Sequence, residues 1–278
     1  MIINGITISE KKLDGCRSII SENSLRHEYE FLGHTDKEIS KIYDLSTSWI
    51  CKLRKIYDIK TSSEYQLHRN PLRLVSLSGY QKEVLHGSLF GDSCIALQDS
   101  GSGYWKCTHC MKQEGYLLKM TEIFAPFVAK IFYGERPYEE EGELFPFVSA
   151  RSYSLPQFTE YRTLFYPHGE KDLRAELMEK ISPIGFAYWF MDDGSTNGYG
   201  FDITTFSSFF RLKEARDMFN DILGLKVSII WGGEEGRIHV FKESHDLAYE
   251  YINPELPECL LYKLPKKYRG LSHKIVAD

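Results

Sequence analysis

The sequence predicts an α+β fold in which two similar halves follow a small all-helical domain. A repeated motif predicts the halves: "VLHGSLFGDS" at 84–93 and "GFAYWFMDDGS" at 185–195 are largely apolar stretches that lead to an acid. The acids of the two copies, Asp92 and Asp193, stand about a hundred residues apart. A repeat of this length indicates duplicated half-domains and not a solenoid of short units.

The order of elements after each motif also repeats. Apolar alternation around a Gly/Ser turn predicts two short strands within 94–109, and helical spacing predicts a long amphipathic helix over 112–133. Further strands are predicted over 145–154, 200–206, 226–231 and 237–241, and further helices over 155–166, 211–224 and 244–252. Each half therefore reads as helix, strands, helix, strands, helix, an αββαββα pattern.

Residues 34–57 contain the clearest local pattern of the chain. Thr35 is a predicted N-cap, Glu38 completes a capping box three residues later, and Ser46 caps a second helix after the break "YDLS". Two short helices joined in this way, with "SLRHEYEFLG" as a supporting first helix, are typical of a helix-turn-helix, whose second helix enters the major groove of DNA. The alternative is a small helical packing module with a solvated basic face. The candidate DNA contacts are Ser48, Lys52, Arg54 and Lys55, and the apolar face is Trp49, Ile50, Leu53 and Ile56.

The region after this pattern is polar, lacks periodicity and ends in a proline, which indicates a linker. We therefore expect a helix-turn-helix domain at 1–60, a linker at 61–77, a first repeat at 78–175 and a second repeat at 176–278.

Composition places the chain among ordinary globular proteins, because 42% of its residues are hydrophobic and 26% are charged. It has no apolar run long enough for a membrane span and no secretory signal at its start, so we expect a cytoplasmic protein, nucleoid-associated in a prokaryote. The net charge of −5 means that a DNA-binding surface would need a basic face set against an acidic back. Six scattered cysteines are expected to be free thiols, and "CTHC" at 107–110 lacks the second ligand pair of a zinc finger.

The two motifs carry a family resemblance. "LHGSLFGDS" at 85–93 and "FAYWFMDDG" at 186–194 resemble the LAGLIDADG motif of homing endonucleases, in particular of the monomeric meganucleases that have two copies. "LFYPHGEK" at 164–171 and "LLYKLP" at 260–265 also resemble that family, so the likeness extends from roughly residue 78 to 270. Ser93 departs from the family, which usually has glycine after the acid. The resemblance implies a pseudo-two-fold duplicated fold with saddle-shaped antiparallel sheets, acting as a monomer on a long target in double-stranded DNA.

The resemblance also implies a shared site at the ends of the two motif helices. Packed side by side, with the small residues Gly87 and Gly91 in the first copy, the helices would bring Asp92 and Asp193 together. Adjacent carboxylates suit hard divalent cations, so we expect Mg²⁺, or Mn²⁺, bound by these two acids. Such ions activate water and stabilise a leaving oxygen in phosphodiester hydrolysis. The register of the family motif assigns the catalytic role to Asp193 and a supporting role to Asp192.

Two lysines join this site by resemblance. Lys171 and Lys263 match positions where the family carries basic residues near its metals. A lysine there could polarise the attacking water or neutralise charge that develops on the phosphate. The alternative for each is an ordinary solvated surface lysine.

The family's sheets read base pairs in the major groove, where the pairs present distinguishable donors and acceptors. Outward polar residues on the predicted strands are therefore candidate DNA contacts, although alternation also produces ordinary solvated faces. The candidates are Gln98, Lys106, Arg151, Tyr153, Asp202, Thr204, Arg237 and His239.

Three functions are compatible with this pattern. The leading hypothesis is a site-specific DNA endonuclease, which the presence of both acids and Lys263 favours. The alternatives are a DNA-binding regulator that does not cut and a maturase that assists splicing of intron RNA. We expect no self-excising intein, because the chain has no opening cysteine and no terminal His-Asn pair.

Overall fold

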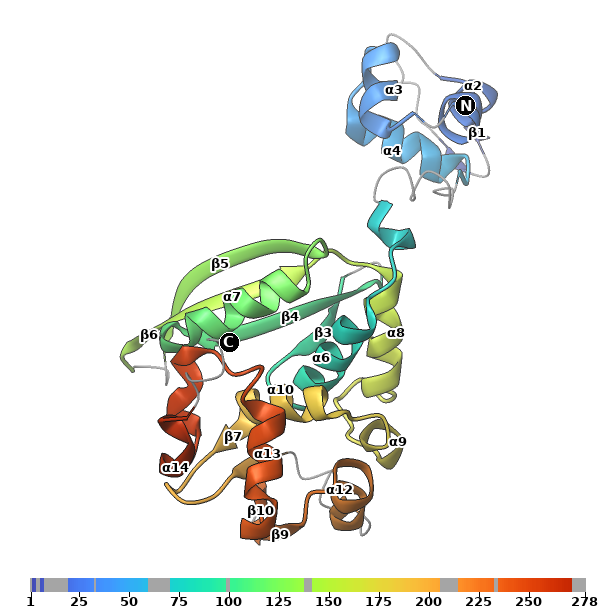
Figure 1. Cartoon of the computed structure of the whole chain (residues 1–278). Helices are drawn as coiled ribbons and strands as arrows, with labels where there is room; N and C mark the ends of the chain where they lie inside the picture. The colour runs from blue at the N-terminus through green and yellow to red at the C-terminus, as the bar shows by residue number, and fades with distance from the viewer. Residues whose placement is uncertain are drawn as a thin grey trace, which may run out of the picture. The chain divides into compact units, whose positions relative to one another are not determined.

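The computed structural model describes residues 2–3, 6–7, 20–32, 34–59, 71–98, 101–137, 142–205, 215–232 and 235–271. The chain divides into two compact units, Met1–Leu74 and Val75–Asp278. In Figure 1 the helices of the first unit are blue, and the second unit runs from teal to red. Within the described ranges, no helix has the length and apolar character needed to cross a membrane.

The first unit is a cluster of short helices. Its elements are α2 (Glu22–Arg26), the π-helical turn η1 (His27–Phe31), α3 (Asp36–Ile42) and α4 (Thr47–Ile56). The predicted capping box at Thr35 is confirmed, since the Glu38 N–H donates to Thr35 Oγ1 and the Thr35 N–H donates to Glu38 Oε2. Ser46 caps α4 as predicted by accepting the Trp49 N–H. The buried side chains of Ile50 and Leu53 face the other helices, as the apolar spacing predicts.

This unit is not purely helical, contrary to the prediction. A short antiparallel pair joins β1 (Ile2–Ile3) to β2 (Ile6–Thr7). The sequence between these strands is Asn-Gly, which is the strongest short-range signal for a hairpin. That signal, flanked by isoleucines, was available to predict the pairing.

The second unit contains two four-stranded antiparallel sheets with the same strand order. The first sheet runs β3-β4-β6-β5 and the second runs β7-β8-β10-β9, so both place their third strand at the edge beside the fourth. The strands are β3 (Cys94–Leu97), β4 (Gly103–Cys110), β5 (Val128–Pro137), β6 (Leu144–Ser152), β7 (Gly194–Ser195), β8 (Asp202–Thr205), β9 (Val227–Gly232) and β10 (Glu235–Val240). The helices are α6 (Gly79–Phe90), α7 (Glu114–Ile123), α8 (Pro156–Phe165), α9 (Ala175–Met178), α10 (Pro183–Asp193), α12 (Ala215–Leu223) and α13 (His245–Ile252). Both halves therefore have the predicted αββαββα order.

Strand alternation separates a core face from an open face in each sheet. Along β4, residues at odd positions from Gly103 to His109 are buried, whereas the residues between them are half-exposed. Helices α7 and α8 pack against β4 and cover the buried face of the first sheet (Figure 1). In β10, Ile238 and Val240 are buried while Arg237 is exposed. The open faces are therefore free of covering helices in the described part of the chain.

The prediction of one long helix over 112–133 is wrong beyond the middle of that range. Helix α7 ends at Ile123, and residues from Val128 onward belong to β5. Pro126 explains the break, since proline lacks the N–H that a helix needs and disfavours helical geometry in the residue before it. The predicted linker lies largely outside the described residues, except that Pro71–Leu74 form a 3₁₀ turn, η2.

Candidate active site

Helices α6 and α10 lie side by side at the junction of the two halves (Figure 1). Their backbones are so close that a Cβ added at Gly87 would lie 2.0 Å from the carbonyl oxygen of Gly185. A Cβ added at Gly91 would lie 2.4 Å from Cβ of Asp192. The predicted use of Gly87 and Gly91 for close packing is confirmed. The small residue that faces them from the second helix is Gly185, one position before the stretch that matches the family motif.

The two predicted acids are at the ends of these helices. Asp92 follows α6 and its side chain is 45% exposed, whereas Asp193 is the last residue of α10 and is largely covered. Burial, and then the negative charge of Asp92, raise the pKa of Asp193 to about 7. Because the charge of Asp92 acts on Asp193, the two carboxyl groups share one electrostatic environment.

The two predicted lysines hold equivalent positions, one in each half. Lys171 Nζ donates to the carbonyl oxygens of Gly91 at 2.8 Å and Ser93 at 2.9 Å. Lys263 Nζ donates to the carbonyl oxygens of Met191 at 2.6 Å and Asp192 at 2.5 Å. Each lysine thus binds carbonyl groups at the C-terminal end of the motif helix in its own half, where the helix dipole favours a cation.

Neither lysine is a solvated surface residue. Lys263 is only 6% exposed and Lys171 is partly buried. Burial lowers the pKa of both ammonium groups, although the nearby carboxylates act in the opposite direction. Both cations therefore lie within reach of the acidic cluster and have only small access to water.

Asp192 and His109 complete the cluster. Ligand atoms of Asp92, His109 and Asp192 all lie within 4.8 Å of one another, a spacing that one metal ion could bridge. His109 Nδ1 is 3.6 Å from Asp92 Oδ2, and its Nε2 is 3.8 Å from Asp192 Oδ1. Asp192 is fully buried, and burial raises its pKa well above the usual value. The Tyr116 hydroxyl donates to its Oδ1 at 2.8 Å, and the Asp92 N–H donates to its Oδ2 at 3.1 Å.

The donor set fits a hard divalent cation. Asp92 and Asp192 supply carboxylate oxygens, the ligands that Mg²⁺ and Mn²⁺ prefer, His109 supplies a ring nitrogen, and Asp92 is accessible from outside. The arrangement can hold a cation next to a bound phosphate, with two lysines close by.

Sequence reasoning missed His109 and Tyr116 as members of this cluster. Alternation along β4 places His109 on the buried face, at the end of the strand nearest the motif acids. The same alternation places the two cysteines of "CTHC" on opposite faces of the strand, since Cys107 is buried and Cys110 is exposed. Cys107 Sγ instead lies 3.1 Å from His109 Nε2. An inward histidine on the strand after a motif acid was the available signal.

The predicted DNA contacts on the sheets lie mainly on the open faces. Lys106 and Arg151 are opposite each other on β4 and β6, and Arg237 is opposite Thr204 on β10 and β8. Gln98 is exposed at the β3–β4 turn and Tyr153 is exposed just after β6. Asp202 is the exception, because its carboxylate is buried and lies 2.7 Å from His239 Nδ1. It positions His239 and is not free to contact a base.

The predicted contacts in the first unit differ in their exposure. Ser48, Lys52 and Lys55 are exposed on α4. Arg54 does not point outward, because its guanidinium pairs with both carboxylate oxygens of Asp36 at 2.7 and 2.8 Å and lies over the Tyr29 ring. Its side chain is only 14% exposed, so Arg54 holds this unit together.

Comparison with known proteins supports the geometry. The LAGLIDADG DNA endonuclease family matches residues 82–247, more than half of the chain. The chain is 26% identical over 215 residues to protein RecA of Mycolicibacterium flavescens, covering 70% of this chain and 49% of that protein. It is 24% identical over 198 residues to the cytochrome b mRNA maturase bI2 of Debaryomyces hansenii, covering 66% of this chain and 72% of the maturase. The chain therefore spans about half the length of its RecA relatives.

Among solved structures, the homing endonuclease I-WcaI bound to its DNA recognition sequence has a similar fold. The TM-score is 0.63 at 20% sequence identity, and the match covers 76% of this chain and 96% of that one. This likeness shows that the second unit has the duplicated fold predicted from the two motifs.

Proposed function

We propose, because the chain belongs to the LAGLIDADG DNA endonuclease family, that it is a site-specific, metal-dependent endonuclease acting on double-stranded DNA. The observation that carries the proposal is the junction of α6 and α10. There, the two motif acids, Asp92 and Asp193, stand at the ends of the two helices, and a lysine from each half, Lys171 and Lys263, binds the backbone carbonyl groups beside them. A protein that only binds DNA gains nothing from carboxylates gathered on a phosphate-facing surface.

In this proposal Asp92 and Asp193 hold the cations, Mg²⁺ or Mn²⁺. A divalent ion bound there supplies an activated water and stabilises the leaving oxygen. Lys171 and Lys263 provide fixed positive charge next to the scissile phosphate, which opposes the charge that develops during hydrolysis. Their anchoring to helix-terminal carbonyls keeps that charge in place without reorganisation when DNA binds.

DNA recognition would use the open faces of the two sheets. Lys106 with Arg151 in the first half, and Arg237 with Thr204 in the second, offer donors to base edges and phosphates. Because the two halves differ in sequence, a single chain can read a long asymmetric site as a monomer. The exposed residues Ser48, Lys52 and Lys55 of α4 would add contacts if the first unit is a helix-turn-helix.

The test is cleavage of a randomised duplex library in Mg²⁺ and in Mn²⁺, followed by sequencing of the cut ends. We expect specific double-strand breaks that are lost in Asp92→Asn and Asp193→Asn, whereas Asp221→Asn, an exposed acid on α12, cuts normally. Lys263→Met should reduce cleavage far more than binding. Equal losses of cleavage and of DNA binding would show that Lys263 only contacts a phosphate. Tight binding without cleavage in either metal would instead support a DNA-binding regulator.

The maturase relative gives a second candidate function, assistance to splicing of an intron RNA. A splicing assay with an intron RNA tests it. Stimulated splicing that survives Asp92→Asn and Asp193→Asn would show an RNA activity separate from the cutting site.

A further inference from the structure

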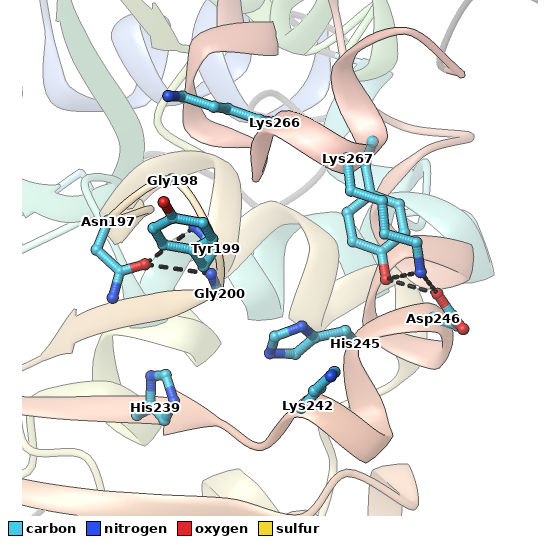
Figure 2. A pocket seen from close by; sticks show the side chains of 11 residues that line it. Asn197, Gly198, Tyr199, Gly200, His239, Lys242, His245, Asp246, Lys266 and Lys267 are labelled. Carbon is cyan, nitrogen blue, oxygen red and sulfur yellow. Dashed lines mark hydrogen bonds and ion pairs between the residues drawn. The ribbon is translucent and has the colours of Figure 1, made fainter.

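A hollow of about 770 Å³ opens in the second half, lined by none of the residues of the acidic cluster (Figure 2). Its size is within the range of roughly 300–1,000 Å³ that ligand pockets occupy. The β7–β8 turn at 197–200 forms one wall. The end of β10, the 3₁₀ turn η4 (Lys242–Ser244), the start of α13 and helix α14 (Lys266–Arg269) form the others.

The turn is a preformed wall. The side-chain oxygen of Asn197 accepts the N–H groups of Tyr199 at 3.1 Å and Gly200 at 3.2 Å, as Figure 2 shows. Gly198 has a φ of 97°, a conformation that favours glycine. The Lys266 N–H donates to the Gly198 carbonyl at 3.1 Å, which ties α14 to the turn. The residues of the hollow are therefore held in place before any ligand binds.

The hollow carries an excess of positive charge. The carboxylate of Asp246, which also lines the hollow, already has partners of its own. Lys267 Nζ lies 2.8 Å and the Tyr268 hydroxyl 2.5 Å from Asp246 Oδ1. Lys242 and Lys266 also line it, and within the described ranges neither ammonium group has a hydrogen-bond or ion-pair partner. Two unpaired cations in one hollow favour an anionic ligand.

The remaining lining residues suit a nucleotide. Tyr199 is 84% exposed, so its ring is available for stacking against a base or sugar. His239 belongs both to the hollow and to the open face of the second sheet, where it neighbours Arg237 and Thr204 on the ladder. The hollow is thus continuous with the face that we assign to DNA recognition.

We propose that this hollow binds the phosphodiester backbone of the DNA strand that crosses the open face of the second sheet, with Lys242 and Lys266 on its phosphates and Tyr199 against an adjoining nucleotide. The inference rests on the proposed DNA-binding function and extends its contact surface from the sheet to η4 and α14. It predicts phosphate contacts that carry affinity and register but no base specificity.

The test is the salt dependence of binding to a random-sequence duplex, measured by fluorescence anisotropy between low and moderate NaCl. Each phosphate contact contributes about 0.9 to the slope of log affinity against log salt. We expect the double variant Lys242→Met/Lys266→Met to lower that slope by about 1 to 2. Lys267 is left intact because it is paired with Asp246. The matched control is Lys82→Met/Lys180→Met, two exposed lysines on α6 and after α9, which should keep the wild-type slope.

A second variant separates stacking from charge. Tyr199→Ala should weaken binding about fivefold or more at every salt concentration, with an unchanged slope, because stacking on an aromatic ring involves no counterion release. Thermal unfolding of each variant checks that the fold is intact.

The outcomes distinguish this proposal from its rivals and from failure of the proposed function. A wild-type slope in the Lys242/Lys266 variant would overturn it. A thermal shift by inorganic phosphate or AMP that the double variant abolishes, with duplex binding unchanged, would assign a small-ligand site instead. If only binding to an RNA hairpin changed its slope, the DNA assignment would fail. A wild-type chain that never cuts DNA would refute the proposed endonuclease without altering the slope result.

Discussion

The carboxylate of Asp192 accepts the backbone N–H of Asp92 across the junction of the two motif helices, over 3.1 Å. The same carboxylate occupies the space in front of Gly91, where a Cβ would lie 2.7 Å from its Oδ2. The second helix thus inserts an acid where the first has only glycine, and it fixes the backbone that carries Asp92. The two halves of the site are built differently although their folds are equivalent.

Asp192→Asn and Asp192→Ala should therefore behave differently. Asparagine keeps an oxygen for the Asp92 N–H, and its amide can donate to the Tyr116 hydroxyl, so stability should change little. Alanine leaves the Asp92 N–H and the buried Tyr116 hydroxyl without this partner, and the unsatisfied buried hydroxyl costs about 1–3 kcal/mol. Chemical denaturation and Mn²⁺ affinity measured by EPR check this. If Asp192→Asn loses Mn²⁺ binding as fully as Asp192→Ala, then Asp192 is a metal ligand and not a positioning residue.

The orientation of Asp192 marks where sequence reasoning reached its limit. The motif spacing was sufficient to predict the two helices, their acids, Gly87 and both lysines, because these depend on local pattern and on likeness to a family. Which of the adjacent acids Asp192 and Asp193 faces the junction depends on how α10 is rotated, since neighbouring helical residues point about 100° apart. That rotation is set by contacts such as the one between Gly87 and Gly185, which join distant segments.

Contacts between distant segments also explain most of the other differences between the sequence predictions and the structure. The pairing of Arg54 with Asp36 involves residues on two helices, so a helical pattern alone leaves Arg54 on the outer face. The end of α7 was predictable from Pro126, but the apolar spacing that continues into β5 outweighed it. His109 enters the site only because β4 passes beside the ends of both motif helices, which is a property of the tertiary fold.

The raised pKa of Asp193 makes stability depend on pH. Its ordinary value is 3.8 and its folded value is about 7, so between these limits the folded protein binds more protons than the unfolded chain. Stability contributed by this group therefore falls as pH rises from about 4 to 7. In EDTA at pH 8, Asp193→Asn should be more stable than wild type by on the order of 1–3 kcal/mol, and the gain should shrink towards pH 4.

Urea denaturation at several pH values measures this difference, with Asp221→Asn as the control that shows no gain. A metal-free Asp193→Asn protein that is less stable than wild type at pH 8 would contradict the prediction. Such a result would mean that the electrostatic attraction of Lys171 and Lys263 for the Asp193 carboxylate outweighs the effect of its burial.

Close contact of the helix backbones predicts a severe effect of Gly87→Ala. The added methyl group would overlap the carbonyl of Gly185, and a backbone group cannot move aside as a side chain can. The two halves must separate, so we expect a loss of about 3 kcal/mol or more, at the upper end of typical overpacking costs. Gly79→Ala in the same helix is the control, because its Cβ meets no atom within 4 Å. Comparable melting temperatures for the two variants would show that the junction is looser than described.

A single carboxylate joins the start of α6 to the middle of α10. Glu255 Oε2 accepts the hydroxyl of Tyr80 at 2.6 Å, the hydroxyl of Tyr188 at 3.0 Å and the ammonium of Lys119 at 3.0 Å. Tyr80 and Lys119 belong to the first half, and Tyr188 and Glu255 to the second. This cluster therefore holds the two halves together.

Glu255→Gln should weaken that link by about 1–3 kcal/mol, since hydrogen bonds to a charged group are stronger than those to an amide. Burial opposes ionisation of Glu255, but the hydrogen bonds from Tyr80 and Lys119 outweigh it and lower its pKa below 4.5. A carboxyl group whose pKa is lowered by folding stabilises the folded protein at pH values above its unfolded pKa. The difference in unfolding free energy between Glu255→Gln and wild type should therefore be full at pH 7 and should disappear as pH falls below about 4.5. Thermal unfolding against pH measures it, with the exposed Glu250→Gln on α13 as control. A Glu255→Gln penalty that persists unchanged at low pH would attribute the effect to shape and not to the charge.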